Sequence, residues 1–238
     1  MTGTTINFAA VIVGSALGML LGGRLPEKVR ETVMAALGIM VLVIGFGMAI
    51  PGNALIVLFS LLIGGIFGEL LRLDDRLTAA GRALEARFSR GGPAGNFTRG
   101  FVTASLVFCV GPLAILGAVQ DGLLGDYRLL AIKSLLDAFA SLAFASTLGL
   151  GVAFSALAVL IYQGAISLSA MGIGSALGSV TRDTPWVIQL SATGGAILVG
   201  IGLGLLDVKR IRVANFTPAI FIAPLITVGL ELLKIQLP

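Results

Sequence analysis

Apolar residues along the chain fall into eight runs separated by short polar stretches. The runs cover residues 5–24, 32–50, 53–71, 100–120, 129–148, 151–171, 186–207 and 213–235. A helix needs about 20 apolar residues to cross the hydrocarbon core of a bilayer. We therefore predict an all-α, polytopic membrane protein with eight spanning helices in a single domain, residues 1–238. Pro218 and Pro224 interrupt the last run, so seven spanning helices are the alternative.

Basic residues mark the loops that face the cytoplasm. Twelve of the 16 lysines and arginines lie in the first, third and seventh connections: Arg24, Lys28, Arg30, Arg72, Arg76, Arg82, Arg87, Arg90, Arg99, Lys209, Arg210 and Arg212. The even-numbered connections hold Arg128 and Arg182. The positive-inside rule then predicts that the N-terminus lies outside. The first run lacks a basic segment before it and a small-residue cleavage pattern, so we expect a retained helix.

The third connection, residues 72–99, is the long one. Its sequence places Leu73, Leu77, Leu84 and Phe88 on one stripe of a helix, with charged residues elsewhere. A pattern of this kind is typical of a short amphipathic helix that lies on the membrane surface. We predict such a helix in a cytoplasmic loop.

Composition narrows the function classes. Charged residues make up 12% of the chain, whereas soluble domains average about 25%. The chain has no histidine and one cysteine, Cys109. Histidine-dependent nucleophilic sites, histidine-ligated metals and paired-cysteine sites are therefore excluded. Because the basic residues flank apolar runs, we expect a lipid bilayer as partner rather than nucleic acid, and no cofactor.

Small residues recur at helical spacing. Gly14, Gly18 and Gly22 form one stripe, and the pairs Gly64/Gly68 and Gly200/Gly204 form two more. Small residues four apart allow helix backbones to approach closely, either within one chain or across a homodimer. An amide residue precedes each set by 11 and 15 positions, at Asn7, Asn53 and Gln189. This spacing suggests an internal repeat, which is frequent among transporters.

The fourth run contains Gly111 and Pro112 at its centre. Proline cannot donate its backbone bond and its ring crowds the preceding turn. We predict a kinked or broken helix there. Broken helices near the membrane midplane form substrate sites in many transporters, although a plain proline kink is the simpler alternative.

The fifth run carries an ionisable pair in its middle, Lys133 and Asp137, four residues apart. A charge at this depth must face the protein interior or water. Ser134 and Ser141 share the helical face of Asp137. Further polar candidates in the neighbouring runs are Gln120, Asp121, Ser155, Tyr162 and Gln163. We predict an ion or proton site centred on Asp137, with a structural ion pair as the alternative; no metal is specified.

Three segments carry a family resemblance: "ASLVFCVGPLAILGAVQDGLLGD", "KSLLDAFASLAFASTLGLGVAFSALAVLIYQG" and "IGLGLLDVKRIRVANFTPAI". They resemble the YqgA/YdfK-like proteins of the bacterial inner membrane, the domain of unknown function 554. This resemblance implies a multi-pass inner-membrane protein, described as transport-related. One helix, "LLDAFASLAFASTLGLG", is also similar to manganese-exporter-type proteins, which implies ion handling by Asp137.

The sequence is compatible with three functions. The first is a secondary transporter or channel for a small cation or small solute, with no enzymatic activity. The second is a non-transporting assembly or regulatory protein, bound through its glycine stripes or basic loop. The third is an intramembrane aspartyl protease that uses Asp121 and Asp137 as a dyad sharing one proton.

Overall fold

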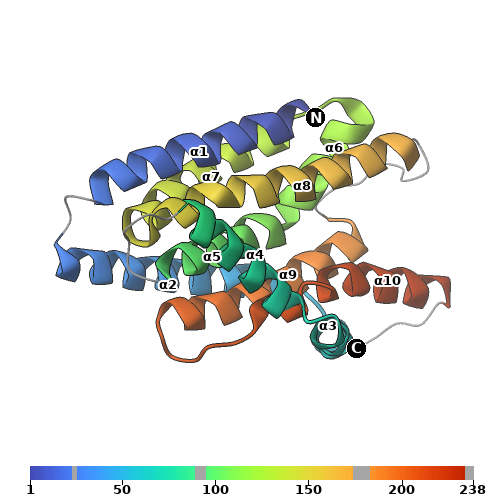
Figure 1. The fold of residues 1–238 in the computed structure, drawn as a ribbon. Helices are drawn as coiled ribbons and strands as arrows, with labels where there is room; N and C mark the ends of the chain where they lie inside the picture. The colour runs from blue at the N-terminus through green and yellow to red at the C-terminus, as the bar shows by residue number, and fades with distance from the viewer. Residues whose placement is uncertain (23–25, 89–94, 174–182, 234–238) are drawn as a thin grey trace. The chain divides into compact units, whose positions relative to one another are not determined.

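The computed structural model describes residues 1–22, 26–88, 95–173 and 183–233. Arg24, Arg90 and Arg182, which contribute to the topology prediction, lie outside these ranges, as does the end of the last predicted run. The helices are α1 (Thr2–Gly22), α2 (Glu27–Ala49), α3 (Ala54–Leu70), α4 (Leu73–Phe88), α5 (Asn96–Val110), α6 (Pro112–Leu124), α7 (Arg128–Leu148), α8 (Leu150–Ile173), α9 (Pro185–Leu205), η2 (Val213–Phe216) and α10 (Ala219–Leu232) (Figure 1).

The all-helical, polytopic class is confirmed. Among the described residues, six segments are long and apolar enough to cross a membrane, and eight if each of two bent helix pairs is one span. One pair is α3 with α4, bent by 54°, and the other is α5 with α6, bent by 62°. In the first pair α3 supplies the apolar length, whereas α4 is the charged, amphipathic helix expected in the third connection.

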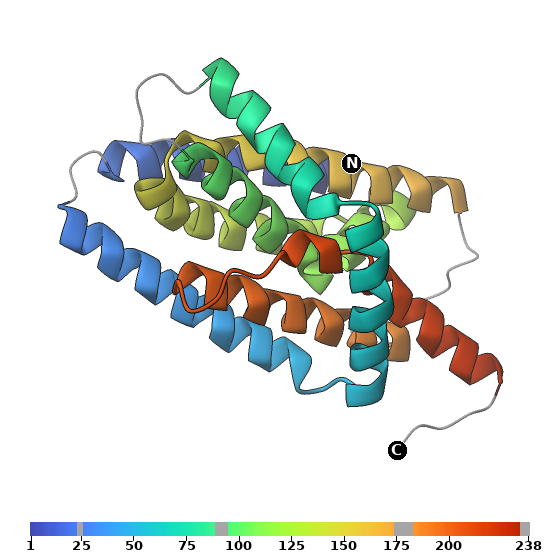
Figure 2. The ribbon, with the colours of Figure 1, turned by 60° about the horizontal axis from the view of Figure 1, so that its bottom comes forward.

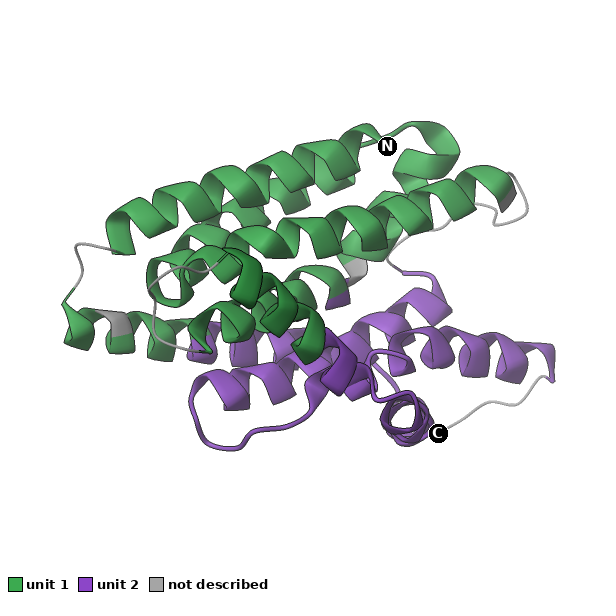
Figure 3. Cartoon of the chain, in the orientation of Figure 1, with its two compact units in different colours: residues 1–37, 78–109, 113–179 green, residues 38–77, 110–112, 180–238 purple. Residues whose placement is uncertain are grey.

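The chain contains two compact units (Figure 3). Unit 1 comprises residues 1–37, 78–109 and 113–179, and unit 2 comprises residues 38–77, 110–112 and 180–238. The helices α2 and α4 each begin in one unit and end in the other. The single domain over residues 1–238 stays a prediction.

In unit 1, α1 packs along α7 (Figure 1). A Cβ atom on the glycines of α1 would overlap successive carbonyl oxygens of α7: Gly14 with Ala138, Gly18 with Leu142 and Gly22 with Ser146. The residue numbers in these contacts rise together along α1 and α7, so the two helices are parallel. A first and a fifth spanning helix must run in the same direction, and this pairing therefore agrees with the predicted order of spans.

The bent pair α5–α6 follows α7 from end to end. At its start, Gly100 meets Leu148, and near its end, Gly117 meets Leu130. Eighteen residues of helix separate these two contacts on α7, which is about 27 Å at 1.5 Å per residue. The length is close to the hydrocarbon thickness. We conclude that α5–α6 is one broken span rather than a loop that returns to the same side.

In unit 2, a second glycine seam joins α2 to α9. Gly45 and Gly195 each leave no room for a Cβ atom against the other's carbonyl oxygen. One heptad away along each helix, Gly38 packs under Leu206 and Gly202 under Leu42. Glycines seven apart, rather than the predicted four apart, therefore allow this close approach.

The remaining glycine pairs of unit 2 differ from each other. Gly64 and Gly68 of α3 pack against Ala219 and Asn215, at the junction of η2 and α10 (Figure 2). A Cβ atom on Gly200 or Gly204 of α9 would meet its nearest neighbour among the described residues at 3.6 Å or 3.9 Å, which is an ordinary contact distance. Only the first pair therefore forms a close seam.

Candidate functional site

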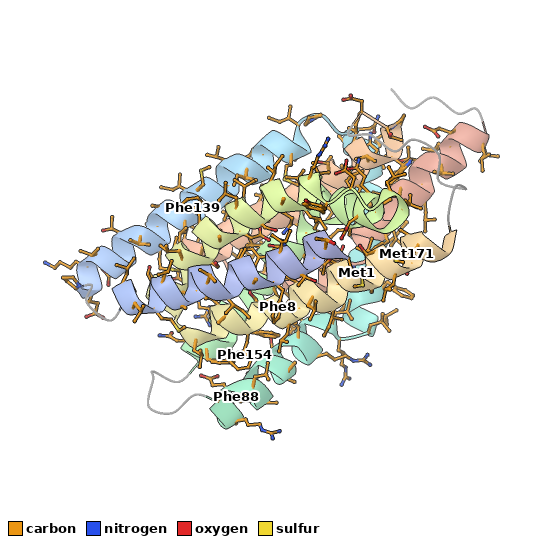
Figure 4. All side chains as sticks on the ribbon, turned by 90° about the horizontal axis from the view of Figure 1, so that it is seen from above. Met1, Phe8, Phe88, Phe139, Phe154 and Met171 are labelled. Atoms are coloured by element: carbon orange, nitrogen blue, oxygen red, sulfur yellow. The ribbon has the colours of Figure 1, made fainter. Side chains whose placement is uncertain are left out.

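The helix α7 divides its residues between two faces. Ile132, Leu135, Leu136 and Phe139 are exposed, and Phe139 projects outward from the bundle (Figure 4). Lys133, Ser134, Asp137 and Ser141 are buried. This distribution suits a helix that turns its apolar face to lipid and its polar face to the protein interior.

Lys133 and Asp137 form an ion pair on the buried face of α7. The ammonium group of Lys133 donates to Asp137 Oδ2, and the two residues are 4% and 7% exposed. Removing two charges from water carries a large desolvation cost, which mutual attraction offsets only when further hydrogen bonds complete the pair. The carboxylate therefore needs a further hydrogen-bond donor, and α1 supplies one.

Asn7 of α1 completes the pair and connects it to α8. Its Nδ2 atom donates to Asp137 Oδ2 at 3.0 Å and to Gln163 Oε1 at 3.3 Å. Asn7 and Gln163 are both fully buried. One amide group thus joins three helices around a single carboxylate. We define Asn7, Lys133, Asp137 and Gln163 as the carboxylate cluster.

The predicted helix break is present between α5 and α6. α5 ends at Val110 and α6 begins at Pro112, a position at which a missing N–H is tolerated because first-turn donors have no intrahelical partner. Cys109, two residues before Gly111, is within electrostatic reach of both Lys133 and Asp137. A Cβ atom on Gly111 would meet nothing within 4 Å, so close packing does not require glycine there.

Three predicted hydroxyls do not join the carboxylate cluster. Ser134 donates to Leu130 O, Ser141 to Ala138 O and Ser155 to Val152 O. Each bond returns to a carbonyl three or four residues earlier in the same helix, which is a common alternative for serine in membrane helices. Ser134 and Ser141 lie on the buried side of α7 with Asp137, but all three hydroxyls donate to carbonyl groups of their own helices.

Asp121 is buried and binds the start of α1. It is 3% exposed, and its Oδ2 accepts from the backbone N–H of Gly3 at 3.1 Å. The carboxylate thereby caps the first turn of α1, where unpaired backbone donors and the helix dipole favour negative charge. Asp121 is therefore a structural partner of α1. The hydrogen bond joins residues that lie 118 positions apart in the sequence.

Two further predicted residues occupy neighbouring positions. Gln120 is half-buried on α6, two residues after the Ala118 carbonyl that accepts from Ser167. Tyr162 is half-buried on α8, next to Gln163, and lies near Cys109. The structure thus brings together Lys133, Asp137 and Gln163 from the predicted set and adds Asn7.

A metal centre is not evident in the described part of the chain. No group of three or more cysteine, aspartate or glutamate side chains gathers there in a way that could hold a metal ion. In the carboxylate cluster, Lys133 already supplies the positive charge next to Asp137. The ion-handling role expected for Asp137 from one helix therefore stays a prediction, and no set of metal ligands surrounds Asp137 among the described residues.

Unit 2 contains a different polar cluster at the ends of α3, α4 and η2. Asn215 donates to Glu69 Oε2 at 2.5 Å, and its Oδ1 accepts from the backbone N–H of Asp74 at 2.8 Å. Arg212 pairs with Glu69 Oε1 at 2.9 Å, with both side chains about 60% exposed. Glu69 therefore pairs with Arg212 across the sequence rather than with its neighbour Arg72. We call Glu69, Asp74, Arg212 and Asn215 the corner cluster.

Two acids of α4, outside the spanning segments, have opposite pKa shifts. Burial raises the pKa of Asp74 above its ordinary value, partly offset by the Ala214 N–H and Arg212. A hydrogen bond from the Thr98 hydroxyl, 2.6 Å long, lowers the pKa of Glu85. Gly81 also packs against Thr98 and Phe101. In unit 1 this helix is thus held against α5.

Taken together, the apolar spans, the broken helix and the buried ion pair define an integral, polytopic helical membrane protein. Residues 2–228 match the family described as "Protein of unknown function (DUF554)". The chain is 32% identical to the "Uncharacterized membrane protein YdfK" of Bacillus subtilis, over 95% of each chain, and 33% identical to the "Uncharacterized protein YqgA" of Escherichia coli, over 93% and 94%. It belongs to this family. No solved structure matches it.

Proposed function

We propose that this chain is a transport protein of the bacterial inner membrane that carries a small cation or small solute. Asp137 is the carboxylate that binds and releases a proton or the cation. The observation that carries the proposal is the carboxylate cluster itself: three helices converge on one buried acid in the middle of a span. Ionisable groups at this depth are costly and mark ion pathways in most membrane proteins.

The broken span supports the same function. Cys109, in the last turn of α5, lies near the charges of Lys133 and Asp137, and α5 ends one residue later, at Val110. Unwound backbone at membrane depth is tolerated where it is enclosed by protein or lines a wet cavity. Transporters place their sites at such breaks.

The protease alternative has less support. Asp121 caps α1 through Gly3, whereas Asp137 is bound to Lys133 and Asn7. A dyad that shares one proton needs two carboxylates facing each other. We therefore retain a non-enzymatic function. The glycine stripe of α1 is occupied by α7, so a homodimer would have to form through another surface.

The test is flux in proteoliposomes. Wild-type protein, Asp137→Asn and Asp126→Asn would be reconstituted with a pH-sensitive dye inside, under gradients of protons and of a panel of monovalent and divalent cations. Asp126 is a matched control because, among the described residues, its carboxylate accepts only from the backbone N–H of Arg128, just before and at the start of α7. We expect flux in wild type and Asp126→Asn and its loss in Asp137→Asn. Unchanged flux in folded Asp137→Asn would exclude Asp137, and no flux with any gradient would favour the assembly alternative.

A further inference from the structure

Each amide of the carboxylate cluster uses one polar atom and leaves the other idle. Asn7 donates through Nδ2 to Asp137 and Gln163, while its Oδ1 is buried without a partner in the described part of the chain. Gln163 accepts through Oε1, while its Nε2 is likewise buried without a partner there. Buried polar atoms are rarely left unsatisfied, and those that are call for an explanation.

The two atoms without a partner in this part of the chain are the ones that would form hydrogen bonds if Asp137 were protonated. An amide oxygen and nitrogen have nearly the same size, and the terminal torsion of asparagine or glutamine has two broad minima about 180° apart. If both amides rotate, Asn7 Oδ1 faces Asp137 and Gln163. It can then accept from the O–H of a neutral Asp137 and from Gln163 Nε2. Asn7 keeps two hydrogen bonds in both arrangements, with donor and acceptor exchanged in each, while Lys133 remains a donor.

We infer that Asn7 is a two-position hydrogen-bond switch that passes the protonation state of Asp137 from α7 to Gln163 on α8. The inference rests on the proposed function, because it requires Asp137 to take up and release a proton. Asn7 and Gln163 are positioning residues in this scheme, and Asp137 alone holds the proton.

The switch changes what the interior presents to a transported species. With Asp137 ionised, the atoms without a partner among the described residues are the acceptor Oδ1 of Asn7 and the donor Nε2 of Gln163. With Asp137 protonated and both amides rotated, they are the donor Nδ2 of Asn7 and the acceptor Oε1 of Gln163. A proton on α7 thus inverts the hydrogen-bonding character of a site on α8, and coupling needs no more than two side-chain rotations.

Other titratable groups lie around Asp137, so the test must distinguish their titration from that of Asp137. Lys133 lies on the same helix and loses its paired carboxylate when Asp137 is protonated. The Cys109 thiol of α5 is near the pair, and the Tyr162 phenol of α8 is near Cys109. α1 contributes Asn7, which does not titrate. The experiment must therefore follow Asp137 and Gln163 separately.

Two spectroscopic signals would be followed in the full-length protein across pH. The carboxylic acid carbonyl stretch that is absent from Asp137→Asn reports the proton. The side-chain amide signals of ¹⁵N-labelled glutamine report Gln163, with only Gln120, Gln163, Gln189 and Gln236 to distinguish. Loss of one signal in Gln163→Met assigns it. Gln189 is an internal control, because it accepts from Asn53 in unit 2.

We expect the Gln163 signal to change with the same midpoint as the Asp137 band, while the Gln189 signal stays constant. The response should be lost in Asp137→Asn, and in Asn7→Leu while Asp137 still titrates. Ser167→Ala, which removes a buried hydroxyl of α8 that bonds to Ala118 instead, should keep the response. If Asn7→Leu does not fold, the wild-type coincidence and Asp137→Asn still decide the matter.

Three results would overturn the switch. They are a Gln163 signal that ignores the titration of Asp137, a response that survives in Asn7→Leu, and an Asp137 that stays ionised at every pH where the protein is folded. Flux measured on the same preparations separates the two proposals. Asp137-dependent flux with a silent Gln163 rejects the switch alone, whereas flux that is indifferent to Asp137→Asn rejects the proposed function.

Discussion

The two units organise polar side chains in opposite ways. In unit 1 the carboxylate cluster lies in the middle of α7 and is almost completely buried. In unit 2 the corner cluster lies at helix ends, and its ion pair, Glu69 with Arg212, is mostly exposed. Asn215 satisfies both of its polar atoms, whereas Asn7 leaves one idle. A cluster that is complete and near the surface fastens helices together; one that is buried and incomplete has the features of a working site.

The largest predicted difference concerns the two ion pairs. Lys133→Met leaves Asp137 charged and unpaired inside the protein, and such a loss costs about 3–5 kcal/mol. Arg212→Met removes an exposed partner of Glu69 and should cost about 1 kcal/mol or less. The free energy of unfolding, measured for both variants in the same detergent or bicelle, checks the comparison.

A double variant sharpens this result. Lys133→Met with Asp137→Leu removes both charges together, so it should regain much of the stability that the single change loses. Equal losses for Lys133→Met and Arg212→Met would mean that the cluster in unit 1 is as well solvated as the corner cluster, and the contrast between the units would be wrong.

Helix seams give the second prediction. In Gly18→Ala, the new Cβ atom would overlap the Leu142 carbonyl of α7, a backbone atom that cannot move aside. Overpacking costs about 1–3 kcal/mol and occasionally more, and here it exceeds the gain in helix propensity of about 1 kcal/mol. Gly47→Ala is the control, since a Cβ atom there meets nothing within 4 Å. The melting temperature should fall for Gly18→Ala and stay level or rise for Gly47→Ala.

The third prediction concerns Asn215. Asn215→Ala leaves the Oε2 atom of Glu69 without its amide donor and the Asp74 N–H without its acceptor, which should cost about 1–3 kcal/mol of stability. Thr217→Val is a matched control because the Thr217 hydroxyl bonds only locally, to Ala214. Flux should be unaffected in Asn215→Ala at temperatures where the protein is folded. Lost flux in that folded variant would show that the corner cluster also takes part in transport.

Much of the fold follows from the sequence, because a lipid environment demands long apolar helices. The helix ends lie within a few residues of the predicted runs; α1, for example, begins at Thr2 rather than at residue 5. The break at Gly111 and Pro112 follows from proline chemistry. The α2–α9 seam was missed because its glycines, such as Gly38 and Gly45, are seven apart rather than four.

The site was only half predictable. Lys133 and Asp137 were visible because charges are rare in an apolar run. Asn7 was noticed for its spacing to glycines but not as a partner of Asp137, since an uncharged amide near a helix end has no electrostatic signal. The serines were included because a shared face does not reveal that a hydroxyl already bonds to its own helix. The burial of Asp121 depends on a contact with Gly3 that no local pattern contains.

The smallest expected effects compare two acids of one helix, α4. The pKa of Glu85 is lowered by the Thr98 hydroxyl from an ordinary value of 4.5. Its contribution to stability is therefore fully present above pH 4.5 and is lost as the pH falls through the lower, folded-state pKa. The pKa of Asp74 is raised by burial from 3.8. Its charge therefore destabilises the folded state at neutral pH, and protonation removes that cost as the pH falls through the raised pKa.

Glu85→Gln and Asp74→Asn separate these contributions. Wild type should be more stable than Glu85→Gln at neutral pH, with a difference that shrinks below pH 4.5. Asp74→Asn should be more stable than wild type at neutral pH, with an advantage that disappears by about pH 3.8. Melting temperatures from pH 7 to pH 3 measure both differences. If the melting-temperature differences of both variants changed in the same direction with pH, burial in unit 2 and hydrogen bonding in unit 1 would not distinguish these two carboxylates. The helix α4 would then be equally solvated along its length.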